Sequence, residues 1–135
     1  MENEIEVARR FSEALDGDRF LEALSLLADE CSYLFRGEVL SGSKDIIATY
    51  EANSVRGKGL LDELSFSSRI EEKQDEKVSV LFTDVLRKGH RSITLQSRQL
   101  LQIKDGKIIH IEHCDIDGEP EKLALFFEST GIQWE

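Results

Sequence analysis

Residues 100–116 read LLQIKDGKIIHIEHCDI, and this stretch decides the fold. Two segments in which apolar and polar residues alternate flank the dipeptide Asp105-Gly106. Such a dipeptide between alternating segments is a strong signal for a two-residue β-hairpin, because both turn positions need a positive φ. The sequence therefore predicts two strands, over residues 91–104 and 107–117, joined by a tight turn.

The strand pattern extends upstream of this hairpin. Residues 63–72 and 78–88 also read as strands, and short polar breaks at 74–76 and 88–90 separate the segments. Consecutive long strands joined by short turns are typical of an antiparallel meander. We therefore expect four neighbouring antiparallel strands in the second half of the chain.

The first half has a helical period instead. Apolar residues recur every three or four positions over residues 5–15 and again over 20–27, which predicts two short helices. Residues 30–36 predict a short strand and 37–42 a turn region, and a third helix begins near Ser43 and ends by Gly57 or Gly59. A last helix is expected between Pro120 and Gly131.

These elements place the protein in the α+β class. A sheet of this kind needs cover on one face, so we expect it to curve, with the helices packed in its concave face. The result is a cone whose open end is a natural pocket. The 135 residues suit one domain, predicted over 1–135.

Composition limits the expected partners and compartment. The chain carries 27 acidic and 17 basic residues, a net charge of −10. Nucleic acids and anionic membranes attract basic patches, so we expect neither as a partner. The opening residues MENEIEVARR do not resemble a signal or transit peptide, and no apolar run is long enough to span a bilayer. We therefore expect a cytoplasmic protein.

No metal or cofactor is expected. His110 and His113 would point to opposite faces of one strand, so they could not share an ion. Cys31 and Cys114 form no CxxC pair and are expected to be free thiols. The sequence has no Gly-rich phosphate loop and no GxSxG motif.

Three stretches carry a resemblance to a known family. They are FSEALDGDRFLEALSLLADECSYLF (residues 11–35), LSGSKDIIATY (40–50) and the hairpin at 100–116. Their order resembles the nuclear transport factor 2-like superfamily, and more closely its SnoaL-like polyketide cyclases and ketosteroid isomerases. The resemblance implies a cone-shaped fold with a hydrophobic cavity, often dimeric through the outer face of the sheet.

The resemblance also implies where catalytic residues would lie in this chain. The steroid isomerases use a tyrosine and two acidic groups at positions that fall near Phe11, residues 34–35 and Gln99, where this chain lacks proton-transfer groups. Steroid isomerase chemistry of that type is therefore not expected. The SnoaL-like cyclases place a carboxylate late in the sheet, and Asp115 resembles that position.

Strand alternation shows which groups could cooperate with Asp115. Ile109, Ile111, His113 and Asp115 share one face, which the isoleucines mark as inward. Partial desolvation would raise the pKa of the aspartate and lower that of the histidine, toward values useful for proton transfer. The alternative is a hydrogen-bonded pair that closes the cone without chemistry.

A hydrophobic small molecule is the partner that such a cavity predicts. The expected ligand-binding residues are Phe11, Tyr33, Phe35, Tyr50, Gln99 and Ile111, although phenylalanine and tyrosine at such places belong to the core more often than they contact a ligand. Three functions stay open. They are small-molecule binding, an isomerase or cyclase that uses Asp115 and His113 for proton transfer, and a protein-interaction module.

A homodimer is expected through the outer face of the sheet. Alternation predicts that this face carries apolar groups, and apolar groups on an uncovered face mark an interface. The residues are Leu81, Thr83, Val85, Leu100 and Cys114.

Overall fold

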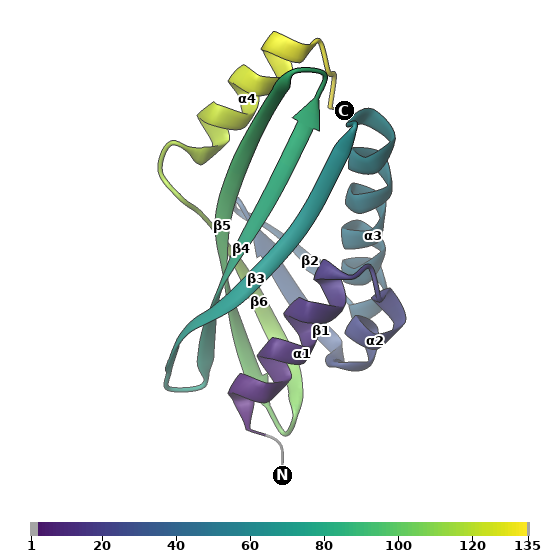
Figure 1. Ribbon diagram of the computed structural model, residues 1–135. Helices are drawn as coiled ribbons and strands as arrows, with labels where there is room; N and C mark the ends of the chain where they lie inside the picture. Colours follow the sequence, from purple (N-terminus) through teal and green to yellow (C-terminus); the bar gives the residue numbers. More distant parts are fainter. Residues whose placement is uncertain (1–2, 135) are drawn as a thin grey trace.

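The fold places four helices on a six-stranded sheet (Figure 1). It is seen in a computed structural model that describes residues 3–134. The helices are α1 (Glu4–Asp16), α2 (Phe20–Ser25), α3 (Ser43–Leu60) and α4 (Glu119–Thr130). The strands are β1 (Leu27–Phe35), β2 (Glu38–Ser41), β3 (Glu63–Gln74), β4 (Lys77–Lys88), β5 (Arg91–Lys104) and β6 (Lys107–Asp115).

The sheet confirms the predicted meander and adds one parallel pairing. The strand order is β2-β1-β6-β5-β4-β3, and β3 to β6 are antiparallel neighbours. Asp105 and Gly106 have φ angles of 53° and 78°, as a two-residue hairpin turn requires. Strand β1 pairs with β6 in parallel, and this joins the first half of the chain to the meander.

Two sequence predictions in the first half were wrong. The region 37–42 contains β2, which pairs with β1 through a turn at Arg36 and Gly37, where φ is 49° and 87°. This strand is only four residues long, too short for a clear alternation. Leu27 begins β1 instead of ending the second helix, because it pairs with Ile108 of β6.

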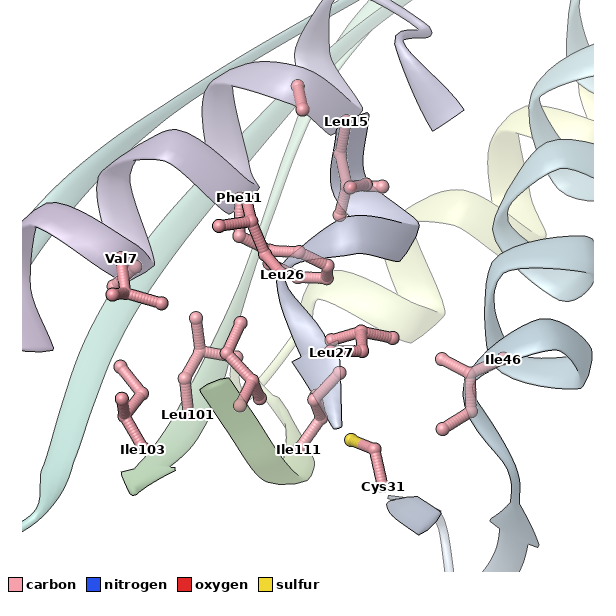
Figure 2. Packing of buried hydrophobic residues seen from close by; sticks show 14 of the residues in the cluster. Val7, Phe11, Leu15, Leu26, Leu27, Cys31, Ile46, Leu101, Ile103 and Ile111 are labelled. Atoms are coloured by element: carbon pink, nitrogen blue, oxygen red, sulfur yellow. The ribbon is translucent and has the colours of Figure 1, made fainter. Parts of the chain in front are cut away.

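The helices cover the concave face of the curved sheet, as predicted, and build the core there (Figure 1). Helix α1 buries an apolar stripe against β3, β4 and β5, and Asn3 caps its first turn by accepting a hydrogen bond from the Glu6 amide at 2.8 Å. The stripe meets inward side chains of β5 and β6 in one cluster (Figure 2). Labelled members of this cluster are Val7, Phe11, Leu15, Leu101, Ile103 and Ile111.

A β-bulge corrects the predicted alternation in β6. The β5 pairing shifts between Gln102 and Ile103, which face His110 and Ile108, so Ile109 is the extra residue. Ile108 therefore takes the fully buried inward position that was expected of Ile109. Beyond the bulge the alternation holds, because Ile111 is again in the core.

The convex face is more polar than the sequence indicated. Leu81 is only 4% exposed, although it alternates with core residues that point to the other face. Its cross-strand neighbours are Arg69 and Arg98, and Arg98 donates to Glu71 at 2.6 Å. Val85 on the same face is 38% exposed. No helix within residues 3–134 combines the length and apolar character needed to cross a membrane.

Candidate functional site

A pocket of about 420 Å³ opens on the concave face, next to the packed core. Its walls come from the sheet and from all four helices. Trp134 also lines it and stacks on Phe127 of α4, with ring centroids 5.9 Å apart. Most of the walls are apolar. The main side chains are Phe66, Phe82, Leu86 and Leu95 from the sheet, and Leu123 and Phe127 from α4.

A neutral polar group lies at one end of this pocket. The Tyr50 hydroxyl donates to Oε1 of Gln99 at 2.9 Å, and Nε2 of Gln99 donates to the Tyr33 hydroxyl oxygen at 3.3 Å. The two tyrosine rings stack with centroids 5.6 Å apart. Burial raises the pKa of Tyr33 to about 12 and that of Tyr50 well above its usual value. Both phenols therefore stay protonated and can serve as hydrogen-bond donors.

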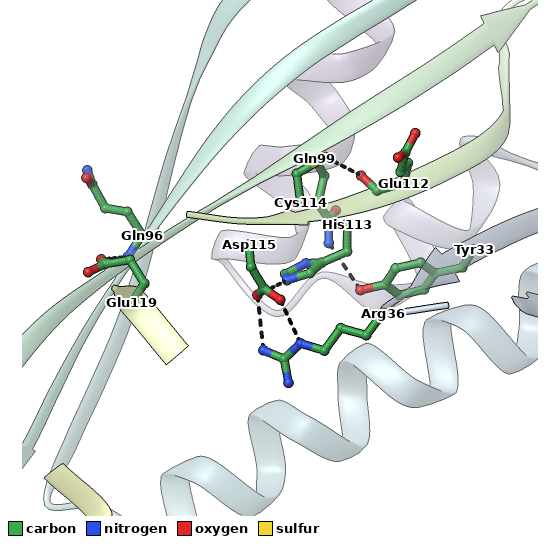
Figure 3. Close-up of polar contacts among 9 residues, drawn as sticks. All are labelled: Tyr33, Arg36, Gln96, Gln99, Glu112, His113, Cys114, Asp115 and Glu119. Carbon is green, nitrogen blue, oxygen red and sulfur yellow. Dashed lines mark hydrogen bonds and ion pairs between the residues drawn. The ribbon is translucent and has the colours of Figure 1, made fainter. Parts of the chain in front are cut away.

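A chain of three hydrogen-bonded polar side chains, His113, Asp115 and Arg36, lies beside Tyr33 (Figure 3). Nε2 of His113 lies 3.0 Å from Oδ1 of Asp115. Arg36 donates to both carboxylate oxygens of Asp115, at 2.8 and 3.0 Å. The His113 ring packs on Phe35 with centroids 4.7 Å apart. Its Nδ1 atom is buried and has no hydrogen-bond partner among residues 3–134.

The expected electrostatics of Asp115 were wrong. Desolvation was predicted to raise its pKa, but the hydrogen bonds from Arg36, with a smaller contribution from His113, lower that pKa to about 2. Alternation within β6 could not reveal this partner, because Arg36 comes from the turn between β1 and β2. Asp115 is therefore a permanent anion at neutral pH.

Three other carboxyl groups, those of Asp16, Asp18 and Asp84, line the pocket and were missed from the sequence, and Asp18 is paired with Lys58. Burial raises the pKa of Asp84 in β4 to about 6, with a smaller contribution from the nearby charge of Asp16. Asp16, at the end of α1, accepts a hydrogen bond from Ser68 at 2.6 Å, and burial also raises its pKa. A signal was present in β4. Asp84 is the one acid among the apolar inward positions Val78, Val80, Phe82 and Leu86.

Comparison with known proteins identifies the fold. No family model and no curated protein matches the sequence. An LEH-like epoxide hydrolase from Mycobacterium tuberculosis has a TM-score of 0.67 at 18% identity, with 96% of each chain covered. An NTF2-like protein of unknown function from Burkholderia pseudomallei has a TM-score of 0.68 at 18% identity, covering 98% of this chain and 100% of that chain. The chain has the nuclear transport factor 2-like fold.

A third structure has the same fold. A candidate polyketide cyclase from Pseudomonas putida has a TM-score of 0.65 at 13% identity, covering 90% of this chain and 98% of that chain. Nuclear transport factor 2-like folds host unrelated activities, so the roles of individual residues must come from their geometry.

Within this nuclear transport factor 2-like fold, the predicted site residues separate into three groups. Phe11 and Ile111 are fully buried core residues and do not line the pocket. Asp115 lies beside the pocket without lining it. The residues that do line it are Tyr33, Phe35, Tyr50, Gln99 and His113.

Metal-ligating groups do not gather within the described range. No three His, Cys, Asp or Glu side chains of residues 3–134 are placed to hold one ion. His110 pairs with Ser32 at 2.6 Å, through its Nδ1 atom, and does not contact His113. Cys31 and Cys114 are both free.

Proposed function

We propose that this protein binds a hydrophobic small molecule with a polar group in its concave pocket. The observation that carries the proposal is the pocket itself, about 420 Å³ with mostly apolar walls and a few polar groups. Ligand sites commonly measure roughly 300–1,000 Å³ and have this composition. Two similar structures are named for enzymes of small organic molecules, an epoxide hydrolase and a candidate polyketide cyclase, which supports the proposal.

The polar end of the pocket would orient such a ligand. Gln99 donates to the oxygen of Tyr33, whose hydroxyl also lies within hydrogen-bond reach of Tyr50, so the Tyr33 proton can go either to Tyr50 or to a ligand oxygen. A carbonyl or hydroxyl group placed there would receive this hydrogen bond while the ligand body contacts the phenylalanines and leucines. An open pocket also favours ligand binding over a protein-interaction module, for which the cone would be filled by side chains.

A pair of variants on opposite faces of β5 tests the binding proposal. Ser97 lines the pocket, and Thr94 is exposed on the convex face. Thermal shift is measured with a panel of hydrophobic ketones and polyketide-like aromatic compounds. We expect compounds that raise the melting temperature of the wild type and of Thr94→Phe but not of Ser97→Phe. Equal shifts for Ser97→Phe, or a panel with no active compound, would contradict the proposal.

Isomerase or cyclase chemistry by proton transfer is a second candidate. The observation that favours it is the 3.0 Å contact of His113 Nε2 with Asp115, together with the unpartnered Nδ1. If Nε2 carries the proton that is donated to Asp115, Nδ1 is a bare acceptor that can take a proton from a carbon acid. In this arrangement Asp115 fixes the tautomer and stabilises the imidazolium that forms.

Turnover of any ligand found in the panel separates binding from catalysis. General acid–base groups contribute about 10²–10⁴-fold to a rate, so we expect losses of that size for both His113→Gln and Asp115→Asn. Ligand affinity should change little. Unchanged turnover in a folded His113→Gln or Asp115→Asn variant would exclude this pair from the chemistry and leave the binding proposal intact.

A further inference from the structure

We infer that the pocket selects a ligand that carries a protonated amine on an apolar body. This inference rests on the proposed binding function and names the class of ligand. It comes from the part of the wall formed by Asp16 and Asp84, which is acidic where the Tyr33, Tyr50 and Gln99 group is neutral.

Asp84 lies among apolar side chains without a partner. Its direct cross-strand neighbours are Phe66 on β3 and Leu95 on β5, and both also line the pocket. No hydrogen bond or ion pair to its carboxyl group is found among residues 3–134. A carboxylate held in apolar surroundings loses hydration that nothing else in the chain replaces. A cation in the pocket would supply the missing partner.

Asp16 brings a second acceptor to the same pocket. Oδ2 of Asp16 accepts the hydrogen bond from Ser68, whereas Oδ1 is buried and unpartnered among the described residues. The two carboxyl groups are close enough for the charge of Asp16 to raise the pKa of Asp84. An alkylammonium group has three N–H donors, so it can hydrogen-bond to more than one acceptor, and both acids favour a positive charge in the pocket.

The cations near this part of the wall already have other partners. Lys58, whose ammonium lies 5.6 Å from the Phe66 ring centroid, is bonded to Asp18. Arg36, which also lines the pocket, is bonded to Asp115. The pocket therefore keeps an excess of negative charge beside aromatic rings, and such rings also attract cations.

Three probes of one shape test the inference. They are 1-adamantylamine, 1-adamantanol and 1-adamantanecarboxylate, which carry positive, zero and negative charge at pH 7. Affinities are measured by isothermal titration calorimetry for the wild type, for Asp84→Asn, and for Asp29→Asn, which removes the same charge at an exposed position of β1. A hydrogen bond between two charged groups favours the amine by about tenfold or more over the alcohol.

The expected result is binding in the order amine, alcohol, carboxylate in the wild type and in Asp29→Asn. Asp84→Asn should lose the preference for the amine and keep its affinity for the alcohol. If the alcohol binds as tightly as the amine, or if Asp84→Asn keeps the preference, the inference is wrong and the binding proposal stands. If none of the probes binds the wild type, the inference is overturned. The thermal-shift comparison of the wild type with Ser97→Phe, made with the ketone panel, then decides separately whether the binding proposal stands.

Discussion

Arg36, in the turn between β1 and β2, holds both carboxylate oxygens of Asp115 at the end of β6, with hydrogen bonds of 2.8 and 3.0 Å. The turn gives Arg36 a left-handed backbone with a φ of 49°, and its guanidinium also lies 4.7 Å from the Phe35 ring centroid. The contact joins the β1–β2 hairpin to the strand that carries His113. By holding Asp115 as an anion, the contact places a negative charge next to the Nε2 atom of His113.

Removing this guanidinium should release the pKa of Asp115. In Arg36→Asn the new residue tolerates the left-handed backbone, and we expect the pKa of Asp115 to rise from about 2 toward its ordinary value. The Arg36–Asp115 pair stabilises the fold at pH values above the ordinary pKa of an aspartate. This stabilisation is lost as the pH falls through the lowered pKa of Asp115, about 2. Because both groups are partly exposed, the loss at pH 7 should not exceed about 1 kcal/mol. Carboxyl NMR titration measures the shift, which Arg91→Asn should not produce.

Asp84 should make the stability depend on pH in the opposite sense. Burial raises its pKa from 3.8 to about 6, so the folded state binds the proton more tightly than the unfolded chain. The free energy of unfolding then falls as pH rises between these values and stays lower above them. Asp84→Asn should be more stable than the wild type by about 3 kcal/mol at pH 7.5 and nearly equal at pH 3.5. Urea unfolding at both values checks this, and an Asp84→Asn variant without a gain at pH 7.5 would contradict it.

The meander could be predicted because its signals are local. Asp105 and Gly106 determine a turn by their own backbone preferences, and alternation marks the strands on either side. The parallel pairing of β1 with β6 could not be predicted in this way, since it depends on contacts such as Tyr33 with Ile111 across a large sequence separation. The bulge at Ile109 is likewise set by the register with β5.

The candidate site was predictable where it follows strand alternation. Tyr33, Phe35, Gln99 and His113 all line the pocket, as inward positions of β1, β5 and β6 should. The charge state of Asp115 was not predictable, because Arg36 reaches it from another strand pair. Asp84 could have been found as an acid on the apolar face of β4.

Phe11 should matter for stability through the core. It is 0% exposed and meets Tyr50 edge to face, with ring centroids 6.1 Å apart. Phe11→Ala leaves a cavity under α1 and should lower the free energy of unfolding by about 3–5 kcal/mol. Leu21→Ala is the matched control, because Leu21 is 84% exposed and its loss should change stability by less than about 0.5 kcal/mol. Similar effects of the two substitutions in urea unfolding would contradict this assignment.

Two glycines of α3 should respond differently to a methyl group. A Cβ at Gly59 would meet no atom within 4 Å, so Gly59→Ala should stabilise the helix by about 0.5 kcal/mol. A Cβ at Gly57 would lie 2.6 Å from Cδ2 of Leu64, so the Leu64 side chain must move. The cost of this movement offsets the stability gained from the higher helix propensity of alanine. Gly57 also lines the pocket, and Gly57→Ala should weaken ligand binding. An equal gain in melting temperature for both variants would show that Leu64 moves aside without a cost in stability, and would contradict this prediction.

The convex face of the sheet is the proposed contact of a two-fold homodimer. Val85 is an exposed apolar residue of this face, at 38%, and it lies beside Thr94 of β5 in the register. A glutamate at Val85 would place like charges across the two-fold axis without a partner. We expect the wild type to sediment as a dimer at micromolar concentrations and Val85→Glu to sediment as a monomer. Val55→Glu, at a 66% exposed position of α3, should leave the dimer intact. A wild-type protein that sediments only as a monomer at these concentrations would exclude this interface.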